Sequence, residues 1–504
     1  MSLRRHFFCF HLLKYRPMKE LLQEYPIFFS ILQILYVVGV LALAVKIIMD
    51  TRRTSKTLAY LLLVVFLPIV GVIVYFVFGV NYRKTRFFSF KIKYNQEVYD
   101  DIRQKIRAAH DKALADRPDI QEKFRSTVDF LARATQSPLI NGNHVQLLQN
   151  GEEKFPKVFE VLSNAKHHIH LEYYIYEADD IGKQLAELLM QKAKEGVTVR
   201  FLYDDFGSSG MRKKLRKRLE EAGVHVSPVN KVRFKLFANR INYRDHRKII
   251  VVDGQHAFTG GINVADKYIN PNDSRYWRDV HLYIRGAGAF YFQYLFLTGW
   301  MFATKKMLKP ENGFFFSGEP DAAGKTIQVA ASGPDTTPAI MMTTVSAIYS
   351  AKKRILLATP YFIPTEPVMN AIKQQSLAGV EIFLLAPERG DSAVVNAAAF
   401  SYFEDLLSWN VRIWLYQKGM MHAKTMVVDD DFACVGTANL DIRSHELNFE
   451  VNTLIYDKEI SEQLAESFMA DLQESREIKL HEWQQRPKLK IVFENLARLL
   501  SPLM

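Results

Sequence analysis

Two long apolar runs stand near the start of the chain. The first, Ile27 to Val45, has 19 residues without a charge, and the second, Leu58 to Val80, has 23. As helices rising 1.5 Å per residue, they would span about 28 and 34 Å, enough to cross the hydrocarbon core of a bilayer. Neither run has the polar face of a helix in a soluble domain. A cleaved signal peptide is the rival interpretation of the first run, but a second apolar run follows at once. The pattern predicts two transmembrane helices.

Basic residues flank this predicted hairpin unevenly. The leader and the segment after the second run each carry five, and the loop between the runs carries four. These residues are Arg4, Arg5, Lys14, Arg16 and Lys19; Arg83, Lys84, Arg86, Lys91 and Lys93; and Lys46, Arg52, Arg53 and Lys56. The more basic side of a membrane protein is normally cytoplasmic. We therefore expect a cell-membrane protein with two spans, whose large domain faces the cytoplasm.

A pattern of strand, helix and strand occurs twice in the rest of the chain. NAKHHIHLEYYIY (164–176) and SAKKRILLATPYFI (350–363) each open one copy, and each is followed by an amphipathic helix and a second apolar strand. Gly196 and Gly379 come just after the helices, where a left-handed cap is expected. Because crossovers between parallel strands are right-handed, each copy should form a parallel unit.

The fold class that follows is α/β, with two similar halves packed side by side and the active site between them, preceded by the two-helix transmembrane hairpin. The expected domains are a basic leader (1–25), two transmembrane helices (26–80), a basic and helical connector (81–137), a first half (138–302), a linker (303–325), a second half (326–485) and a C-terminal amphipathic helix (486–504).

A motif is repeated in the two halves. HRKIIVVDGQHAFTGGIN begins at His246, and HAKTMVVDDDFACVGTAN begins at His422. In both, Lys follows two residues after the His, Asp seven, Gly fourteen and Asn seventeen residues after it. One such match would arise by chance in some chains of this length, but two with the same apolar filling indicate a duplication. Each half then contributes one imidazole and one ammonium group to a shared site.

Strand geometry separates the roles within each motif. Side chains alternate along a strand, so each His points the same way as the Lys two residues later, whereas the Asp has the opposite parity. The aspartates should therefore hold a turn through backbone hydrogen bonds. Acids about thirty residues past each His are better partners for the imidazoles, because either could accept the second ring N–H and fix the tautomer. The residues concerned are His246, Lys248 and Asp253; His422, Lys424 and Asp429; and the acids Asp279 and Glu450.

This set of residues suits a phosphodiester. The lysines, with Asn263 and Asn439, could neutralise the oxygens of a phosphate under in-line substitution. One His would attack phosphorus, while the other would protonate the leaving alcohol and then deprotonate the incoming one. A structural role for each His and a zinc site are the alternatives, but two histidines without a third ligand make a poor zinc site. The two cysteines are far apart, and we expect neither a metal nor a cofactor.

The motifs resemble those of the phospholipase D superfamily, which carry H-x-K-x4-D followed by Gly and Asn. NYRDHRKIIVVDG, GGINVAD, TPYFIP, GTANLDIRS and LNFEV, together with the paired apolar runs, resemble the bacterial cardiolipin synthases from about Leu32 to the C-terminus. The resemblance implies that the His, Lys and Asp of both motifs are catalytic, with His246 as the nucleophile and His422 as the acid and base. Three positions depart from the family pattern: Asp245, Gly299 and His445.

The implied reaction moves a phosphatidyl group from one phosphatidylglycerol to another through a phosphatidyl-histidine, giving cardiolipin and glycerol. A net charge of +12 would suit nucleic acid or anionic lipid. The membrane runs favour lipid, so phosphatidylglycerol and anionic membrane lipid are the expected partners, without nucleic acid; the oligomeric state stays open. The alternatives are a phospholipase D-type hydrolase and a membrane-anchored, non-enzymatic lipid-binding scaffold.

Overall fold

A computed structural model describes residues 26–51, 54–76, 106–211, 214–229, 243–271, 275–308 and 321–501. The basic leader, the first part of the expected connector and the centre of the expected linker lie outside these residues. The chain divides into two compact units, residues 1–84 and 85–504.

The first apolar run forms a single long helix. Helix α2 (Pro26–Asp50) has 25 residues, carries almost no buried side chains, and is the one described helix that is long and apolar enough to cross a membrane. At 1.5 Å per residue it extends over about 37 Å. One membrane-spanning helix is thus supported at the place the sequence predicts.

The second apolar run does not form one continuous helix in the described residues. It forms α3 (Thr54–Phe66) and α4 (Pro68–Val74), which are separated by Leu67 in a non-helical conformation. A Cβ atom at Gly71 would lie 2.5 Å from the backbone of Leu63 and Val64, so α4 folds back closely against α3. Pro68 explains the break, because proline starts helices more readily than it continues them. The predicted second spanning helix is therefore not confirmed.

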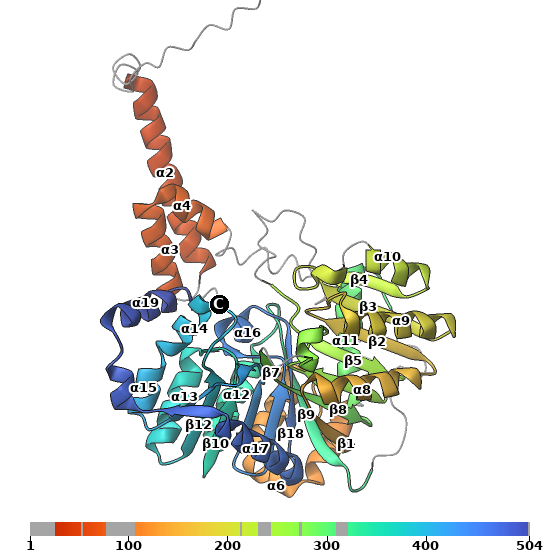
Figure 1. Ribbon diagram of the computed structural model, residues 1–504. Helices are drawn as coiled ribbons and strands as arrows, with labels where there is room; N and C mark the ends of the chain where they lie inside the picture. Colours follow the sequence, from red (N-terminus) through yellow and green to blue (C-terminus); the bar gives the residue numbers. More distant parts are fainter. Residues whose placement is uncertain are drawn as a thin grey trace, which may run out of the picture. The chain divides into compact units, whose positions relative to one another are not determined.

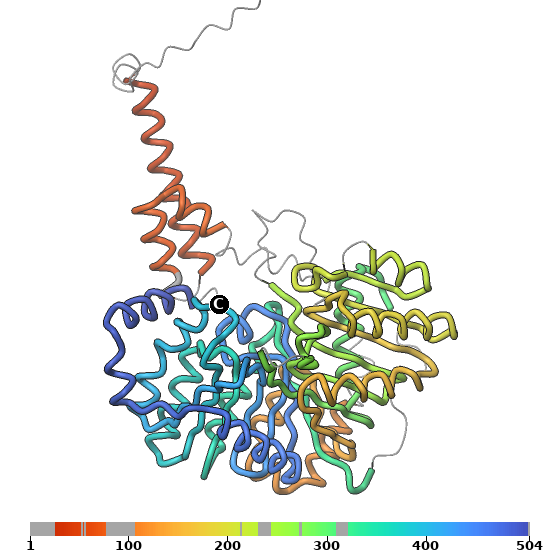
Figure 2. Tube along the Cα trace, in the orientation of Figure 1, coloured from red at the N-terminus to blue at the C-terminus, as the bar shows by residue number. Residues whose placement is uncertain are grey.

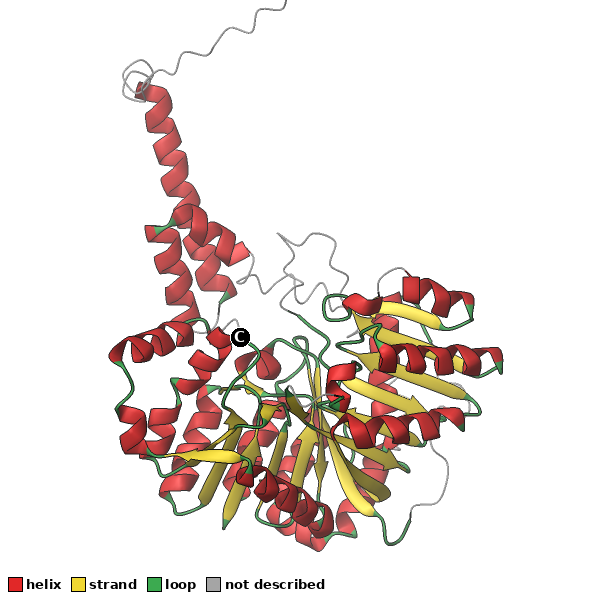
Figure 3. Ribbon diagram, viewed as in Figure 1, coloured by secondary structure: helices red, strands yellow, loops and turns green. Residues whose placement is uncertain are grey.

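The second unit is built around one continuous sheet of fifteen strands (Figures 1 and 3). The strand order is β19-β13-β12-β10-β15-β16-β18-β9-β1-β8-β6-β5-β2-β3-β4. In the first half, the strands are β1 (Ile140–Gln149), β2 (His168–Tyr173), β3 (Thr198–Asp204), β4 (His225–Val229), β5 (Lys248–Val252), β6 (His256–Gly260) and β8 (Val280–Arg285). In the second, they are β9 (Lys325–Ser332), β10 (Arg354–Ala358), β12 (Glu381–Pro387), β13 (Arg412–Tyr416), β15 (Thr425–Val428), β16 (Phe432–Gly436), β18 (Glu450–Ile455) and β19 (Ser475–Ile478).

The strand order repeats itself outward from the centre of this sheet. β1 pairs with β9 at the centre, and the sequence β1-β8-β6-β5-β2-β3-β4 on one side corresponds to β9-β18-β16-β15-β10-β12-β13 on the other. In each half the strands β2–β3–β4 and β10–β12–β13 are parallel, and β19 adds an antiparallel edge strand. The strands that carry the motifs are antiparallel to their neighbours. The predicted α/β fold with two repeated halves is confirmed.

Helices cover both faces of the sheet (Figures 2 and 3). The helices around the sheet are α8 (Asn150–Ser163), α9 (Asp180–Lys194), α10 (Lys214–Glu221) and α11 (Ala289–Thr304) in the first half, and α12 (Ala339–Ser350), α13 (Glu366–Leu377), α14 (Ala393–Phe400), α15 (Phe403–Ser408), α16 (Ile442–Glu446), α17 (Lys458–Gln473) and α18 (Leu480–Gln484) in the second. Helix α19 (Lys488–Arg498) packs on α14 rather than on a strand. The strands beneath them are almost entirely buried, as is usual for sheets covered on both faces.

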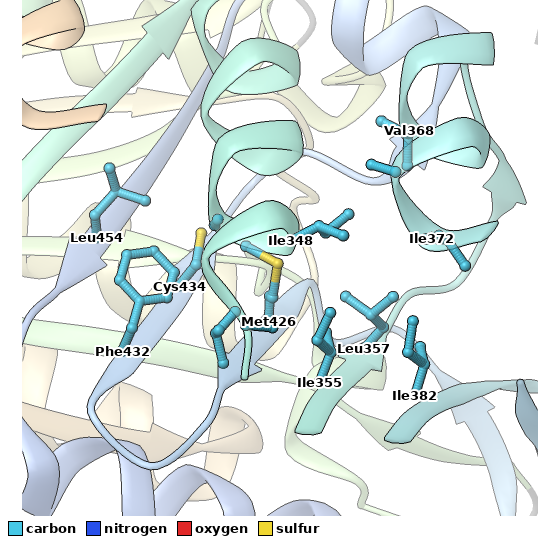
Figure 4. Packing of buried hydrophobic residues seen from close by; sticks show 14 of the residues in the cluster. Ile348, Ile355, Leu357, Val368, Ile372, Ile382, Met426, Phe432, Cys434 and Leu454 are labelled. Carbon is cyan, nitrogen blue, oxygen red and sulfur yellow. The ribbon is translucent and has the colours of Figure 1, made fainter. Parts of the chain in front are cut away.

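The core of the second half shows how this packing holds a motif strand. Met426 of β15 lies among side chains of α12, β10, α13, β12, β16 and β18 (Figure 4). The residues of this core drawn there include Ile348, Ile355, Leu357, Val368, Ile372, Ile382, Phe432, Cys434 and Leu454. Because interiors of this kind are close-packed, the strand that follows His422 cannot shift without disturbing many contacts.

The described part of the expected connector belongs to this unit rather than linking two units. Helices α6 (Pro118–Lys123) and α7 (Arg125–Ala134) contribute to the core of the second half. Phe124 between them stacks on Phe432 with 5.2 Å between ring centroids. Lys123 reaches the motif aspartate Asp429 with an Nζ–O distance of 2.7 Å. A segment that precedes the first half in sequence therefore supports the second half.

The motif aspartates form the turns of two matching β-hairpins. Asp253 follows β5 and Asp429 follows β15, and both have a φ of 51°, in the left-handed region. Their carboxylates accept backbone N–H groups from the start of the neighbouring parallel unit: residues 166–168 for Asp253 and residues 352–354 for Asp429. Asp tolerates this conformation better than most residues and satisfies the exposed amides. These contacts match the turn that strand parity assigns to the aspartates.

Replacing Asp429 should therefore weaken the fold of the second half. We expect Asp429→Ala to lower the free energy of unfolding by about 2–4 kcal/mol, because it removes several charge-assisted hydrogen bonds and a residue suited to positive φ. Asp431→Ala is the matched control: its carboxylate also binds Lys123 but is half exposed, and its loss should cost less than about 1 kcal/mol. Denaturant unfolding of the full chain in mild detergent measures both; equal losses would contradict the assignment.

Candidate active site

His246 lies two residues before β5 and His422 three residues before β15, and both are held by backbone hydrogen bonds to the opposite half. The amide of His246 donates to the carbonyl of Phe449 at 3.0 Å, and the amide of His422 donates to the carbonyl of Arg278 at 2.7 Å. Near the second contact, β7 (Tyr276–Arg278) pairs in parallel with β14 (Gly419–Met421). Each half thus holds the backbone of the other's motif.

A carboxylate from the second half contacts the histidine of the first. His246 Nδ1 lies 3.0 Å from Glu450, whose side chain is fully buried. Thr437 donates its hydroxyl to Glu450 at 2.6 Å, and the Asn448 side-chain amide donates to it at 3.2 Å. Two further donors therefore fix the position of the carboxylate, and it can accept a hydrogen bond from the Nδ1–H of the imidazole.

The reciprocal contact joins the other histidine to the first half. His422 Nδ1 lies 2.5 Å from the carboxylate of Asp279, which is 1% exposed. Each acid follows the histidine of its own half by about thirty residues, yet the structure exchanges them: Asp279 serves His422 and Glu450 serves His246. With Nδ1 directed to the acid, Nε2 is the ring nitrogen left for chemistry in both cases.

Burial and the motif lysines keep both imidazoles neutral. Burial lowers the pKa of His422 to about 4, with a further contribution from Lys424, against the opposing effect of Asp279. Burial also lowers the pKa of His246, and Glu450 opposes it. An imidazole that is neutral at pH 7 and donates its Nδ1–H to a carboxylate has a free lone pair on Nε2. Both rings can thus act as a nucleophile or as a base.

The two lysines lie in the same buried site. Lys248 Nζ donates to the carbonyl of His246 at 2.7 Å, and Lys424 Nζ lies 2.9 Å from His422 Nδ1. Burial lowers the pKa of Lys248 to about 7 and that of Lys424 to about 8. The charge of Lys424 also lowers the pKa of Lys248, so the two ammonium groups act on each other. An anion placed between them would be attracted by both.

The asparagines of the motifs are largely engaged by the protein. Asn263 accepts the amide of Ile175 at 3.2 Å and donates to the hydroxyl of Tyr268 at 3.0 Å. Asn439 donates to Asp441 at 2.9 Å, while its side-chain oxygen is buried without a hydrogen-bond partner. Each amide nitrogen has used one of its two hydrogens, so at most one hydrogen of each is left for a phosphate.

Aromatic rings outside the two motifs pack against both imidazoles. Tyr174 meets His246 edge to face at 4.8 Å, and Trp277 lies 5.1 Å from His422 between ring centroids. Tyr268 lies at 6.4 Å from His422 on a different element. The sequence could have indicated two of these rings in part, because Tyr174 directly follows strand β2 and Trp277 precedes Asp279 by two residues. These rings restrict the imidazoles to one orientation.

A buried ion pair supports the segment in front of the first motif. Arg244 Nη1 lies 3.2 Å from Asp204, and both side chains are almost completely buried. Asp204 also accepts the backbone amide of Asp245, one of the positions that depart from the family pattern, at 3.0 Å. The negative charge of Asp245 acts to raise the pKa of Lys248, against the larger effect of burial. The charge of Asp245 therefore favours the protonated form of Lys248.

Among the residues that the structure describes, no group of three His, Cys, Asp or Glu side chains is arranged to hold a metal ion. The site consists of two imidazoles, two buried ammonium groups and two buried carboxylates, each half supplying one of each kind. Such a set can bind a phosphodiester anion and present a ring nitrogen to each side of it.

Comparison with known proteins places the chain in a family. A family model described as "Cardiolipin synthase, PLD-like domain" matches residues 158–276 and 344–472, and one described as "Phospholipase_D-nuclease N-terminal" matches residues 38–79. A cardiolipin synthase of Geobacillus sp. (strain WCH70) is 39% identical over 479 residues, covering 94% of both chains. The "Major cardiolipin synthase ClsA" of Bacillus subtilis (strain 168) is 36% identical over 94% of this chain and 99% of its own.

A solved structure shares the fold. The phosphatidylserine synthase of Haemophilus influenzae Rd KW20 has a TM-score of 0.60, at 14% identity, and covers 76% of this chain and 100% of its own. At that identity the likeness concerns the fold alone. The relatives that are 36–39% identical span nearly the whole chain, and the family model matches both halves. The chain belongs to the cardiolipin synthase family of the phospholipase D superfamily.

Proposed function

We propose that the protein is a phosphatidyltransferase that converts two molecules of phosphatidylglycerol into cardiolipin and glycerol. The observation that carries the proposal is the pair of imidazoles, each bound to a buried carboxylate of the other half and accompanied by a buried lysine. Its relatives along 94% of the chain are named cardiolipin synthases. Exchanging one phosphodiester for another needs no external energy source, which fits a site without a nucleotide-binding loop.

In the first step, His246 Nε2 attacks the phosphorus of one phosphatidylglycerol. A nitrogen–phosphorus bond forms, the bond from phosphorus to the glycerol headgroup oxygen breaks, and His422 gives its Nε2 proton to that oxygen. Glu450 holds the Nδ1 proton of His246 and stabilises the positive charge that develops on the ring. The bound phosphodiester anion favours the protonated form of His422, which the free site disfavours.

In the second step, the hydroxyl of another phosphatidylglycerol attacks the phosphatidyl-histidine. His422 takes the hydroxyl proton, the new oxygen–phosphorus bond forms, and the bond to His246 breaks. Asp279 holds His422 in the orientation that both steps require. Lys248 and Lys424 offset the charge on the phosphate oxygens in both transition states. The motif aspartates Asp253 and Asp429 act through the turns that they form rather than on the substrate.

We also propose that the N-terminal unit anchors the enzyme in the cell membrane with the catalytic unit on the cytoplasmic side. Helix α2 supports the anchor, and the basic residues on either side of the apolar runs support the orientation. A second crossing stays a prediction, because α3 and α4 are each shorter than the roughly 20 residues that a bilayer core requires.

The products formed from phosphatidylglycerol alone test the reaction. We expect the purified protein to release cardiolipin and glycerol in equal amounts, and His246→Ala to lower the rate at least about 1,000-fold while the variant still unfolds in one cooperative transition. Lipid and glycerol analysis after incubation measures this. Phosphatidate with glycerol would indicate the hydrolase, and no turnover would indicate the lipid-binding scaffold; either result would overturn the proposal.

The lysines predict an asymmetric pH dependence. Because their pKa values in the free site are about 7 and 8, raising the pH above these values removes the charges that attract the substrate. We expect kcat/KM to fall above about pH 8, whereas kcat should persist to higher pH, since bound phosphate favours the charged lysines. Initial rates between pH 6 and 10 measure both constants. A kcat/KM that stays flat to pH 9.5 would contradict the buried-lysine account.

A further inference from the structure

The last described helix of the chain presents an uncovered apolar face. One face of α19 rests on α14, where Ala497 packs in a cluster with Ala397, Ala398 and Ala399. The other face consists of large apolar side chains that are between 46% and 84% exposed. These residues are Leu489, Val492, Phe493, Leu496, Leu499 and Leu500. Soluble proteins rarely expose so many large apolar side chains next to one another.

Helical geometry arranges these residues as one stripe. At about 100° per residue, the five side chains from Leu489 to the C-cap residue Leu499 fall within an arc of about 120° around the helix axis, and Leu500 follows in the turn after the helix. Lys488 lies at one edge of the arc and Lys490 lies beyond the other. This order, an apolar stripe bordered by lysines, is typical of helices that lie in the plane of a membrane interface.

The charged residues of α19 are also divided between its buried and its exposed sides. Glu494, its one acid, is 2% exposed and lies 3.2 Å from the Arg486 guanidinium, within the domain. Lys488, Lys490 and Arg498 are all exposed. The solvent-facing charge of the helix is therefore entirely positive. This charge complements an anionic lipid surface, and it would not complement a basic protein surface such as a second copy of this chain, whose net charge is +12.

Helix α19 is attached to the elements that border the candidate active site. Its partner α14 begins after Ser392, next to Asp391, whose carboxylate accepts the hydroxyl of Tyr361 at 2.6 Å. The cluster beneath α19 also contains Ile363, and Ile442 packs against it; Ile442 lies three residues after Asn439 of the second motif. Any surface that binds α19 is thereby held close to the second-half side of the site.

We propose that the apolar face of α19 inserts into the interface of an anionic membrane and holds the site's second-half side against the lipid. Leu489, Phe493, Leu496 and Leu500 enter the region of the acyl chains, while Lys488 and Lys490 bind phosphate groups of the lipid. The role in catalysis rests on the proposed function, because only a lipid substrate requires the site to face the bilayer. Insertion itself does not depend on that function.

Fluorescence quenching by lipid tests the insertion. In full-length Cys9→Ser protein reconstituted into phosphatidylglycerol vesicles, an environment-sensitive dye is attached at Leu496→Cys or, as a control, at Glu462→Cys on α17. Quencher groups on the lipid acyl chains should reduce emission at position 496 at least about threefold more than at position 462. Equal weak quenching would overturn the proposal. A dye at position 496 that neither aqueous iodide nor the lipid quenchers reach would also overturn the proposal, because protein would then cover this face of α19.

Turnover of two forms of the substrate distinguishes a loss of membrane insertion from a loss of folding. Phe493→Asp with Leu496→Asp should lower turnover of phosphatidylglycerol in bilayers about tenfold, and should leave turnover of dispersed short-chain phosphatidylglycerol within about twofold of wild type. Leu377→Asp, at a leucine that is 60% exposed on α13, is the matched control and should change neither rate. Equal loss on both substrates would overturn the catalytic role of α19. Absence of any cardiolipin formation by wild type would refute the proposed function and leave the quenching result valid.

Discussion

The reciprocal exchange of carboxylates between the halves is the interaction on which the rest of the site depends. Glu450 contacts His246 and Asp279 contacts His422, each at 3.0 Å or less. Neither half alone contains an imidazole together with its acid. A buried carboxylate without a partner is costly, so docking of the halves, stability of the site and orientation of both rings depend on the same two contacts. The pairing of β1 with β9 keeps the two halves in the relative position that these contacts require.

Burial then determines the protonation states of the histidines and lysines in the site. Removing the two lysines and two histidines from water lowers their pKa values, so the free site holds neutral imidazoles and weakly held lysine protons. A phosphodiester anion reverses this tendency by favouring the charged lysines and a charged His422. The site is thus electrostatically adapted to its bound state, which is the general requirement for stabilising charge in a transition state.

The sequence predicted the repeated halves, the motif positions and the turn role of the aspartates, because these follow from local periodicity and strand parity. It did not predict which acid serves which histidine, since Asp279 and Glu450 each lie about thirty residues past the histidine of their own half and only the docking of the halves decides. Likewise, the length of the second charge-free run suggested a spanning helix, and the break between α3 and α4 at Pro68 leaves that helix unconfirmed. Nor did the polar pattern before residue 137 show that Phe124 packs in the core of the second half.

A pre-steady-state burst tests the crossed arrangement most directly. With a phosphatidyl ester of p-nitrophenol, the leaving group needs no proton, so formation of the phosphatidyl-histidine depends on His246 and its acid alone. We expect Glu450→Gln to slow the nitrophenolate burst about 100-fold or more, and Asp279→Asn to retain the burst and slow the later turnover. A burst that is lost in Asp279→Asn and retained in Glu450→Gln would contradict the crossed arrangement.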